Sequence, residues 1–362
     1  MRFYVHLITL LFLFTAGLTS KAGAEISKDM SQSHAVVLVY KKIDEDSYND
    51  DSMRLDLFEK HIRTLVEENY NVLPLSYIIN RLKADKPLPS KAVAITFDGG
   101  FRSVYQKAVP LLERFGLPYT LFFPTNLIDR RISHRLSWDE IRSLQKTGLA
   151  GFGITGADNT PLVSGQDTTE IKAELNRARS RFREILGVDP AFLSYPHGIF
   201  SKDSARTVEQ SGFEAAFSNY PGVLYAGSNF YTLPRFLMND SNAKITRFQG
   251  LLDALPLKVS DVHPEDPFTN GTNTVFGFTL NEVSVTNENS LMCRDSGGQV
   301  LNTGIIGQKR VEIRFRQNIM HEKGYVQCLM ADDSESPENK RKPLQWVAIP
   351  YFTRKSDTAL QE

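Results

Sequence analysis

The sequence lacks an excess of charge of either sign. It contains 42 basic and 42 acidic residues among 362, so its formal net charge at pH 7 is zero. Proteins that bind nucleic acid or an anionic surface through their overall field carry a strongly basic patch or net charge. We therefore expect no nucleic-acid partner, and the length suffices for two domains with a core each.

Cysteine is also scarce, with two residues, Cys293 and Cys328. Neither lies near a cluster of histidines, so a zinc site built on them is not expected. Two interpretations stay open for the pair, a disulfide bond or two unpaired buried thiols. The disulfide requires export to an oxidising compartment.

Long apolar runs are missing except at the N-terminus. Arg2, the apolar residues 5–16 and the sequence Ala22-Gly23-Ala24 form the three parts of a secretory signal peptide, residues 1–24. The apolar part is short for a membrane-spanning helix. We expect an exported chain, in the periplasm or outside the cell, with no membrane span after cleavage. The alternative is an uncleaved N-terminal anchor.

What the sequence does contain is a regular alternation of strand and helix patterns over residues 25–255. Continuous apolar, β-branched runs such as 35–40 and 92–97 are typical of strands buried on both faces. Amphipathic helical patterns separate them, one of which begins with a capping box at Ser137 and Glu140. About seven such units predict an α/β fold, a closed or nearly closed (β/α) barrel.

The pattern changes near the C-terminus. Residues 256–271 contain Pro256, Pro264, Pro267 and Gly271, which predicts a linker. Residues 272–362 then show short alternating runs without helical periodicity, typical of a small antiparallel β-sandwich domain. A Cys293–Cys328 bridge there would close a loop of about 35 residues and stabilise the domain by ~3–4 kcal/mol.

Functional groups of a parallel α/β barrel gather at the carboxyl ends of its strands. The polar residues that the predicted strands place there are Lys41, Asp98, the segment 155–159, the segment Tyr195-Pro196-His197, and Arg235. They include one carboxylate of particular interest, Asp98, which is followed by Gly99.

The run AVAITFDGGFRSVYQKAVPLLERFGLPYTLFF, which begins at Ala92, resembles the first signature of the NodB-type polysaccharide deacetylases, carbohydrate esterase family four. The segments AVVLVY, LSWDEIRSLQKTG and FLSYPHGIFS resemble further parts of the family in the same order, from about residue 35 to 236. The resemblance implies a distorted (β/α) barrel with an appended β-sandwich. It also implies hydrolysis of the N-acetyl amide of hexosamine units in a polysaccharide.

The family binds a divalent metal, usually zinc, through one aspartate and two histidines. Carried over to this sequence, its catalytic base is Asp98, but its three metal ligands fall on Gly99, Thr155 and Asn159. None of these offers a good zinc ligand, because glycine has no side chain and hydroxyl and carboxamide groups bind zinc poorly. We therefore expect no cofactor, although zinc is typical of the family.

Several residues are candidates for a site without zinc. Lys41 stands where the family has a histidine and is a candidate cation, either paired with Asp98 or polarising a carbonyl; an exposed loop lysine is the alternative. Arg235 matches an arginine that orients the catalytic aspartate, or else forms a structural ion pair. His197 is a candidate proton donor or sugar ligand, or else a structural histidine. Asp158, beside Asn159, is either a loop residue or a weak metal ligand together with Asp98.

These observations favour three hypotheses. The first is an exported, zinc-free pseudoenzyme that binds N-acetylhexosamine polysaccharide, with Lys41, Thr155, Asn159, Tyr195 and Pro196 in contact with the glycan. The second is an active deacetylase whose catalytic residues are Asp98, Arg235 and His197. The third is a structural partner in an envelope complex for polysaccharide export, with the β-sandwich as the docking module.

Overall fold

The computed structural model describes residues 33–45, 51–163, 167–242, 244–269, 274–283, 290–315, 319, 321–331 and 342–353. The expected signal peptide lies outside these ranges. Within them, no helix has both the length and the apolar character needed to cross a membrane.

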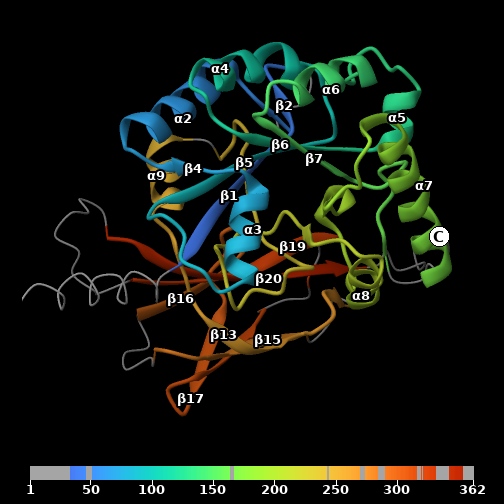
Figure 1. Ribbon diagram of the computed structural model, residues 1–362. Coiled ribbons are helices and arrows are strands. Elements are labelled where there is room, and N and C mark those ends of the chain that lie inside the picture. The colour runs from blue at the N-terminus through green and yellow to red at the C-terminus, as the bar shows by residue number, and fades with distance from the viewer. Residues whose placement is uncertain are drawn as a thin grey trace, which may run out of the picture.

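The N-terminal part is a mostly parallel sheet curled into a half-barrel, which confirms the predicted α/β fold (Figure 1). Its strands follow the order β10 (Leu224–Tyr225), β1 (His34–Tyr40), β5 (Ala92–Asp98), β6 (Tyr119–Phe123), β7 (Ala150–Ile154), β8 (Phe192–Ser194) and β9 (Ala215–Phe217). Two short strands, β4 (Asn71–Val72) and β11 (Phe236–Leu237), pair with β5 and β1. All residues of β5 are buried, as expected for a strand covered on both faces.

The first and last strands of the curled sheet are brought towards each other by one segment. Leu233 forms a β-bridge with Phe217 of β9, and Phe236 pairs with Leu38 of β1. Arg235 lies between these two contacts. The near-closure of the barrel therefore places this arginine next to strands that are far apart in the sequence.

Helices cover the outside of the sheet (Figure 1). They are α2 (Leu55–Glu67), α3 (Leu75–Lys83), α4 (Val109–Arg114), α5 (Thr125–Asp129), α6 (Trp138–Gln145), α7 (Thr168–Leu186), α8 (Lys202–Gln210) and α9 (Ile245–Leu252). The predicted capping box at the start of α6 is confirmed. Ser137 Oγ accepts a hydrogen bond from the Glu140 N–H at 3.2 Å, and the Glu140 carboxylate accepts one from the Ser137 N–H at 2.6 Å.

The C-terminal part is a sandwich of two sheets, as predicted. One sheet has the order β12 (Leu255–Pro256), β20 (Leu344–Thr353), β19 (Lys323–Ala331) and β16 (Leu291–Asp295), with β14 (Phe268–Thr269) also beside β20. The other has the order β13 (Val259–His263), β15 (Val275–Leu280), β18 (Arg310–Arg314) and β17 (Asn302–Ile306). Alternate residues such as Phe278, Val311 and Ile349 fill the space between them.

The prediction of a linker over residues 256–271 is wrong for the part of it that the structure describes. Strands β12 to β14 fall in or overlap this range and pair with the sandwich strands β20 and β15. The prolines are compatible with this pairing. Pro256 lies in β12 at the edge of its sheet, where a missing N–H donor is tolerated, and Pro264 and Pro267 lie in the turn between β13 and β14. The sandwich therefore begins directly after the barrel.

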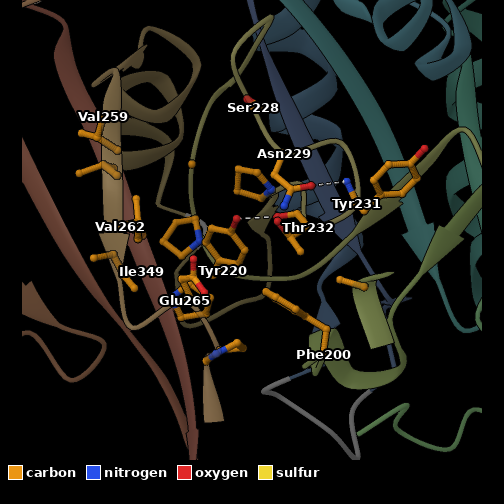
Figure 2. A pocket seen from close by; sticks show the side chains of 18 of the residues that line it. Phe200, Tyr220, Ser228, Asn229, Tyr231, Thr232, Val259, Val262, Glu265 and Ile349 are labelled. Carbon is orange, nitrogen blue, oxygen red and sulfur yellow. Dashed lines mark hydrogen bonds between the residues drawn. The ribbon is translucent and has the colours of Figure 1, made fainter. Parts of the chain in front are cut away.

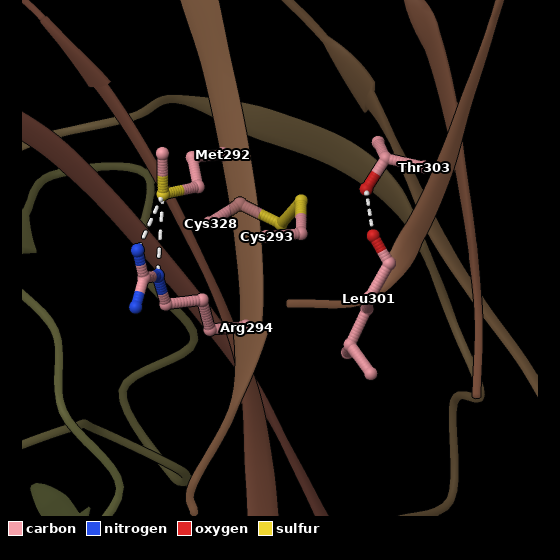
Figure 3. The surroundings of a disulfide bond; sticks show 6 residues. All are labelled: Met292, Cys293, Arg294, Leu301, Thr303 and Cys328. Carbon is pink, nitrogen blue, oxygen red and sulfur yellow. Dashed lines mark hydrogen bonds between the residues drawn. A yellow bond between two sulfur atoms is a disulfide. The ribbon is translucent and has the colours of Figure 1, made fainter. Parts of the chain in front are cut away.

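The disulfide between Cys293 and Cys328 is present (Figure 3). The two residues are direct partners across the antiparallel strands β16 and β19, with their Cα atoms 4.1 Å apart. The bridge therefore joins neighbouring strands of one sheet, and both cysteines are buried in the sandwich core.

One sheet of the sandwich also packs against the barrel. The ring centroids of Trp346 in β20 and Phe236 in β11 lie 5.3 Å apart, and those of Phe352 and Phe200 lie 5.9 Å apart. Because this sheet contacts the barrel on one face and the second sheet on the other, side chains from the sandwich reach the barrel surface.

Candidate functional site

Asp98, at the end of β5, is held by a buried arginine. Its two carboxylate oxygens accept hydrogen bonds from Arg235 Nη1 at 2.9 Å and Nη2 at 2.7 Å, a bidentate arrangement. The Arg235 side chain is completely buried and that of Asp98 is 10% exposed. The sequence prediction that these two residues belong together is confirmed.

The ion pair has further polar partners from neighbouring strand ends. Ser194 Oγ donates to Asp98 Oδ2 at 2.8 Å and accepts from Arg235 Nη2 at 2.7 Å. Arg235 also donates to the Asn219 side chain at 2.6 Å and to the Ser218 carbonyl at 3.0 Å. A buried charge pair is tolerated when its remaining hydrogen-bonding capacity is satisfied in this way.

The position after Asp98 has no room for a metal-binding side chain. A Cβ atom on Gly99 would lie 2.4 Å from Phe101 Cε2 and 3.1 Å from Arg135 Nη1. Gly99 also has a φ of +98°, a conformation that other residues adopt at a cost. Phe101 therefore occupies the space that a side chain at position 99 would enter, the position onto which the resemblance places an aspartate ligand.

Two cations flank the Phe101 ring. The Arg135 guanidinium carbon lies 3.9 Å from the ring centroid and Lys42 Nζ lies 4.9 Å from it, both within cation–π range. Arg135 also donates to the Gly99 carbonyl. Desolvation lowers the pKa of Arg135, and Glu45 acts in the opposite direction. Positive side chains and an aromatic ring thus lie beside the position that follows Asp98.

The residues at the two histidine positions do not complete a metal site either. Thr155 is buried, and among the described residues its hydroxyl has no hydrogen-bond partner. Asn159 is half-buried, with a left-handed φ of 61°. Nowhere in the described part of the chain do three histidine, cysteine, aspartate or glutamate side chains lie close enough to hold a metal ion. The residues present do not fit zinc.

Asp158 is a loop residue, the first of the two interpretations above. Its carboxylate accepts hydrogen bonds from Asn126 at 3.0 Å and Arg130 at 3.3 Å, and so faces α5. The loop itself is held by Glu174 of α7, which accepts from the N–H groups of Ala157 and Asp158 at 2.7 and 3.0 Å.

Lys41 does not pair with Asp98, contrary to one of the two roles considered for it. Its amine forms an ion pair with Asp51, while Asp98 is paired with Arg235. Lys323, from β19 of the sandwich, lies close enough to influence both Lys41 and Asp51 and donates to the His197 carbonyl at 3.4 Å. The rim of the barrel therefore combines Lys41 and His197 with a lysine from the other part of the chain.

His197 is exposed and has a φ of 57°. Desolvation, followed by the charges of Lys41 and Lys323, lowers the pKa of its imidazole. The ring is therefore neutral at pH 7, and its surroundings oppose protonation.

This arrangement predicts a pH dependence of stability. Because the pKa is lower in the folded state than the unfolded value of about 6.5, the unfolded chain binds more protons below that pH. Stability should decline as pH falls through about 6.5, by less than about 1 kcal/mol because the ring is partly solvated. The variant His197→Asn, which tolerates a left-handed φ, should lose less stability between pH 7.5 and 5.5 in urea unfolding. Equal losses in both proteins would contradict this assignment.

Tyr195 and Pro196, predicted as glycan contacts, are buried. The Tyr195 hydroxyl donates to the Tyr231 carbonyl at 2.9 Å, and the centroids of the Tyr195 and Phe200 rings lie 5.3 Å apart. Their burial does not favour direct contact of these side chains with a glycan, and that role stays a prediction. His197, the next residue, is exposed.

Sequence reasoning missed several members of the site. Ser194 lies at the end of a predicted strand, next to Tyr195, and this position could have identified it as a site residue. The sequence contains no comparable indication for Asn219, Arg135 and Lys323, because their partners lie far away in the chain.

Comparisons with known proteins agree with this architecture. Residues 85–216 match the family model of polysaccharide deacetylases. The poly-beta-1,6-N-acetyl-D-glucosamine N-deacetylase of Staphylococcus aureus strain MSSA476 is 26% identical over 194 residues, which cover 51% of this chain and 66% of that protein. The chain thus matches somewhat less than two thirds of the length of this curated relative.

Solved structures show the same fold at lower identity. IcaB from Ammonifex degensii aligns with a TM-score of 0.54 at 19% identity, over 59% of this chain and 96% of that one. A de-N-acetylase from Aggregatibacter actinomycetemcomitans aligns with a TM-score of 0.55 at 17% identity, over 60% of this chain and all of that one. Residues 85–216 thus match the polysaccharide deacetylase family model, and the curled barrel has the fold of these solved deacetylases.

Proposed function

We propose that the protein binds an N-acetylhexosamine polysaccharide outside the cytoplasm without deacetylating it. The observation that supports this most directly is the filled ligand position beside Asp98. Phe101 and Arg135 occupy the space next to Gly99, and the other two ligand positions carry Thr155 and Asn159. Polysaccharide is the substrate class because the relatives act on such chains, among them poly-beta-1,6-N-acetyl-D-glucosamine.

The Asp98–Arg235 pair does not distinguish binding from catalysis, because the matching arginine of the family orients its catalytic aspartate. Both Asp98 oxygens accept hydrogen bonds from Arg235, one of them also from Ser194, and the side chain is 10% exposed. A buried, oriented carboxylate of this kind is compatible with either role. The proposed absence of deacetylation therefore rests on the three ligand positions, Gly99, Thr155 and Asn159.

The loss of metal chemistry has a large kinetic consequence. A bound metal contributes several kcal/mol to transition-state stabilisation and supplies hydroxide at neutral pH. Each ~1.4 kcal/mol that is lost slows the reaction about tenfold. Retained glycan binding without measurable hydrolysis is the expected result.

The test combines binding and acetate release on the purified protein. β-1,6-Linked N-acetylglucosamine oligomers should bind in calorimetry, and acetate should not be released above the rate without protein. Lys41→Ala is expected to weaken binding about three- to tenfold if the rim contacts the glycan, whereas the exposed Lys60→Ala on α2 should leave it unchanged. Acetate release that is abolished in Asp98→Asn would instead support the active-deacetylase alternative. Failure to bind any oligomer would favour a docking role in an export complex.

A further inference from the structure

A groove lies where the sandwich meets the barrel, and neither Asp98 nor Arg235 lines it. Its volume is about 490 Å³, within the range of small-molecule sites. Figure 2 shows the loop around Tyr220 to Thr232 on one side and strands β13 and β20 on the other.

The two walls of this groove differ in chemistry. The sandwich contributes the apolar side chains Val259, Val262 and Ile349, whereas the barrel loop contributes Tyr220 and Asn229. A pyranose ring has apolar faces and a polar edge of hydroxyl and amide groups. An aromatic and aliphatic surface opposite an amide side chain therefore suits a sugar ring better than a purely apolar ligand.

Asn229 offers a hydrogen-bond donor at the groove. Its Oδ1 accepts from the Tyr231 N–H at 3.0 Å, which fixes the side chain and directs the amide nitrogen elsewhere. The residue is exposed, and no described group accepts from this nitrogen. A carbonyl or hydroxyl oxygen of a ligand can take that place.

The charges around the groove favour a neutral ligand. Lys202 of α8 forms an ion pair with Glu265 of the sandwich, across the junction. Arg206 and Glu209 lie one turn apart on the same helix, so the lining carries two cations and two anions. A phosphate or uronate would gain no net attraction there.

The groove and the barrel rim are neighbours through the segment that contains His197 and Phe200. Phe200 follows three residues after His197 and lines the groove, and its ring centroid lies 6.4 Å from that of Tyr220. The groove is therefore close to the rim along the chain.

We propose that the groove is a second carbohydrate subsite for a neutral N-acetylhexosamine stretch of the same chain. The proposal rests on the proposed function and adds that long oligomers bind more tightly than short ones. An oligomer that is bound at the rim is held at a high effective concentration near the groove. Its overall affinity therefore rises, although neither site contacts it more strongly.

The first test is a variant in which a large side chain of the sandwich fills the groove. Val262 is 38% exposed, and Val262→Trp places a large ring between the walls; Val300→Trp, at a 48% exposed position outside the groove, is the matched control. With β-1,6-linked N-acetylglucosamine oligomers of increasing length, Val262→Trp should lose at least about tenfold in affinity for the long ones. Short oligomers should bind as to the unaltered protein.

A second variant checks the polar wall. Asn229→Asp keeps the acceptor for the Tyr231 N–H and removes the amide donor, so it should also weaken only the long oligomers. If both groove variants bind long oligomers like Val300→Trp, the subsite is refuted while the proposed function stands. If the unaltered protein binds no oligomer of any length, both proposals fail together.

Discussion

Replacing Arg235 by methionine should lower the free energy of unfolding by about 3–5 kcal/mol. The substitution leaves the Asp98 carboxylate buried with Ser194 as its one remaining side-chain partner among the described residues. An uncompensated buried charge is among the most destabilising single changes known in proteins. Urea unfolding followed by circular dichroism measures the loss.

The matched control is Arg130→Met. The Arg130 side chain is 63% exposed and pairs with Asp158 at 3.3 Å. Its loss should therefore lower the free energy of unfolding by less than about 0.5 kcal/mol. The double variant Asp98→Asn/Arg235→Met should be more stable than Arg235→Met alone, because it removes the stranded charge as well. If the double variant instead loses the full sum of both single changes, the two residues do not act as a pair.

Restoring the family's aspartate at position 99 should be strongly destabilising by itself. Gly99→Asp places a Cβ atom 2.4 Å from the Phe101 ring and forces a non-glycine residue to a φ of +98°. We expect a loss of about 2–4 kcal/mol, composed of overpacking and backbone strain. The measurement is again the urea-unfolding curve.

Removing the obstructing ring should recover part of this loss. In Gly99→Asp/Phe101→Ala the clash is relieved and about 1–2 kcal/mol of backbone strain remains. The coupling between the two changes should therefore be favourable and larger than about 1 kcal/mol. Strictly additive losses would show that Phe101 does not occupy the ligand position.

These two results concern the space beside Gly99. Phe101 fills this space, and Arg135 and Lys42 lie against its ring. A metal site built at this position would therefore require several simultaneous substitutions, of which Gly99→Asp is only the first.

Much of the fold was predictable because it follows from local pattern. The buried run of β5 and the capping box of α6 depend on residues adjacent in the sequence, and both are present in the structure. The linker was mispredicted because a proline suits an edge strand or a turn between strands as well as a linker. Only the pairing of β12 and β14 with β20 distinguishes these cases.

The residues of the site also fall into those that the sequence predicted and those that only the structure identified. The sequence by itself determined that Asp98 ends a buried strand, that Gly99, Thr155 and Asn159 stand where the resemblance places three metal ligands, and that two cysteines are available for one bridge. Those are statements about which chemical groups exist. Only the tertiary structure decided that Arg235 rather than Lys41 neutralises Asp98, that Phe101 fills the space beside Gly99, and that Lys323 reaches the barrel rim. These contacts join residues separated by long stretches of chain, and their geometry depends on how the barrel curls and where the sandwich packs against it.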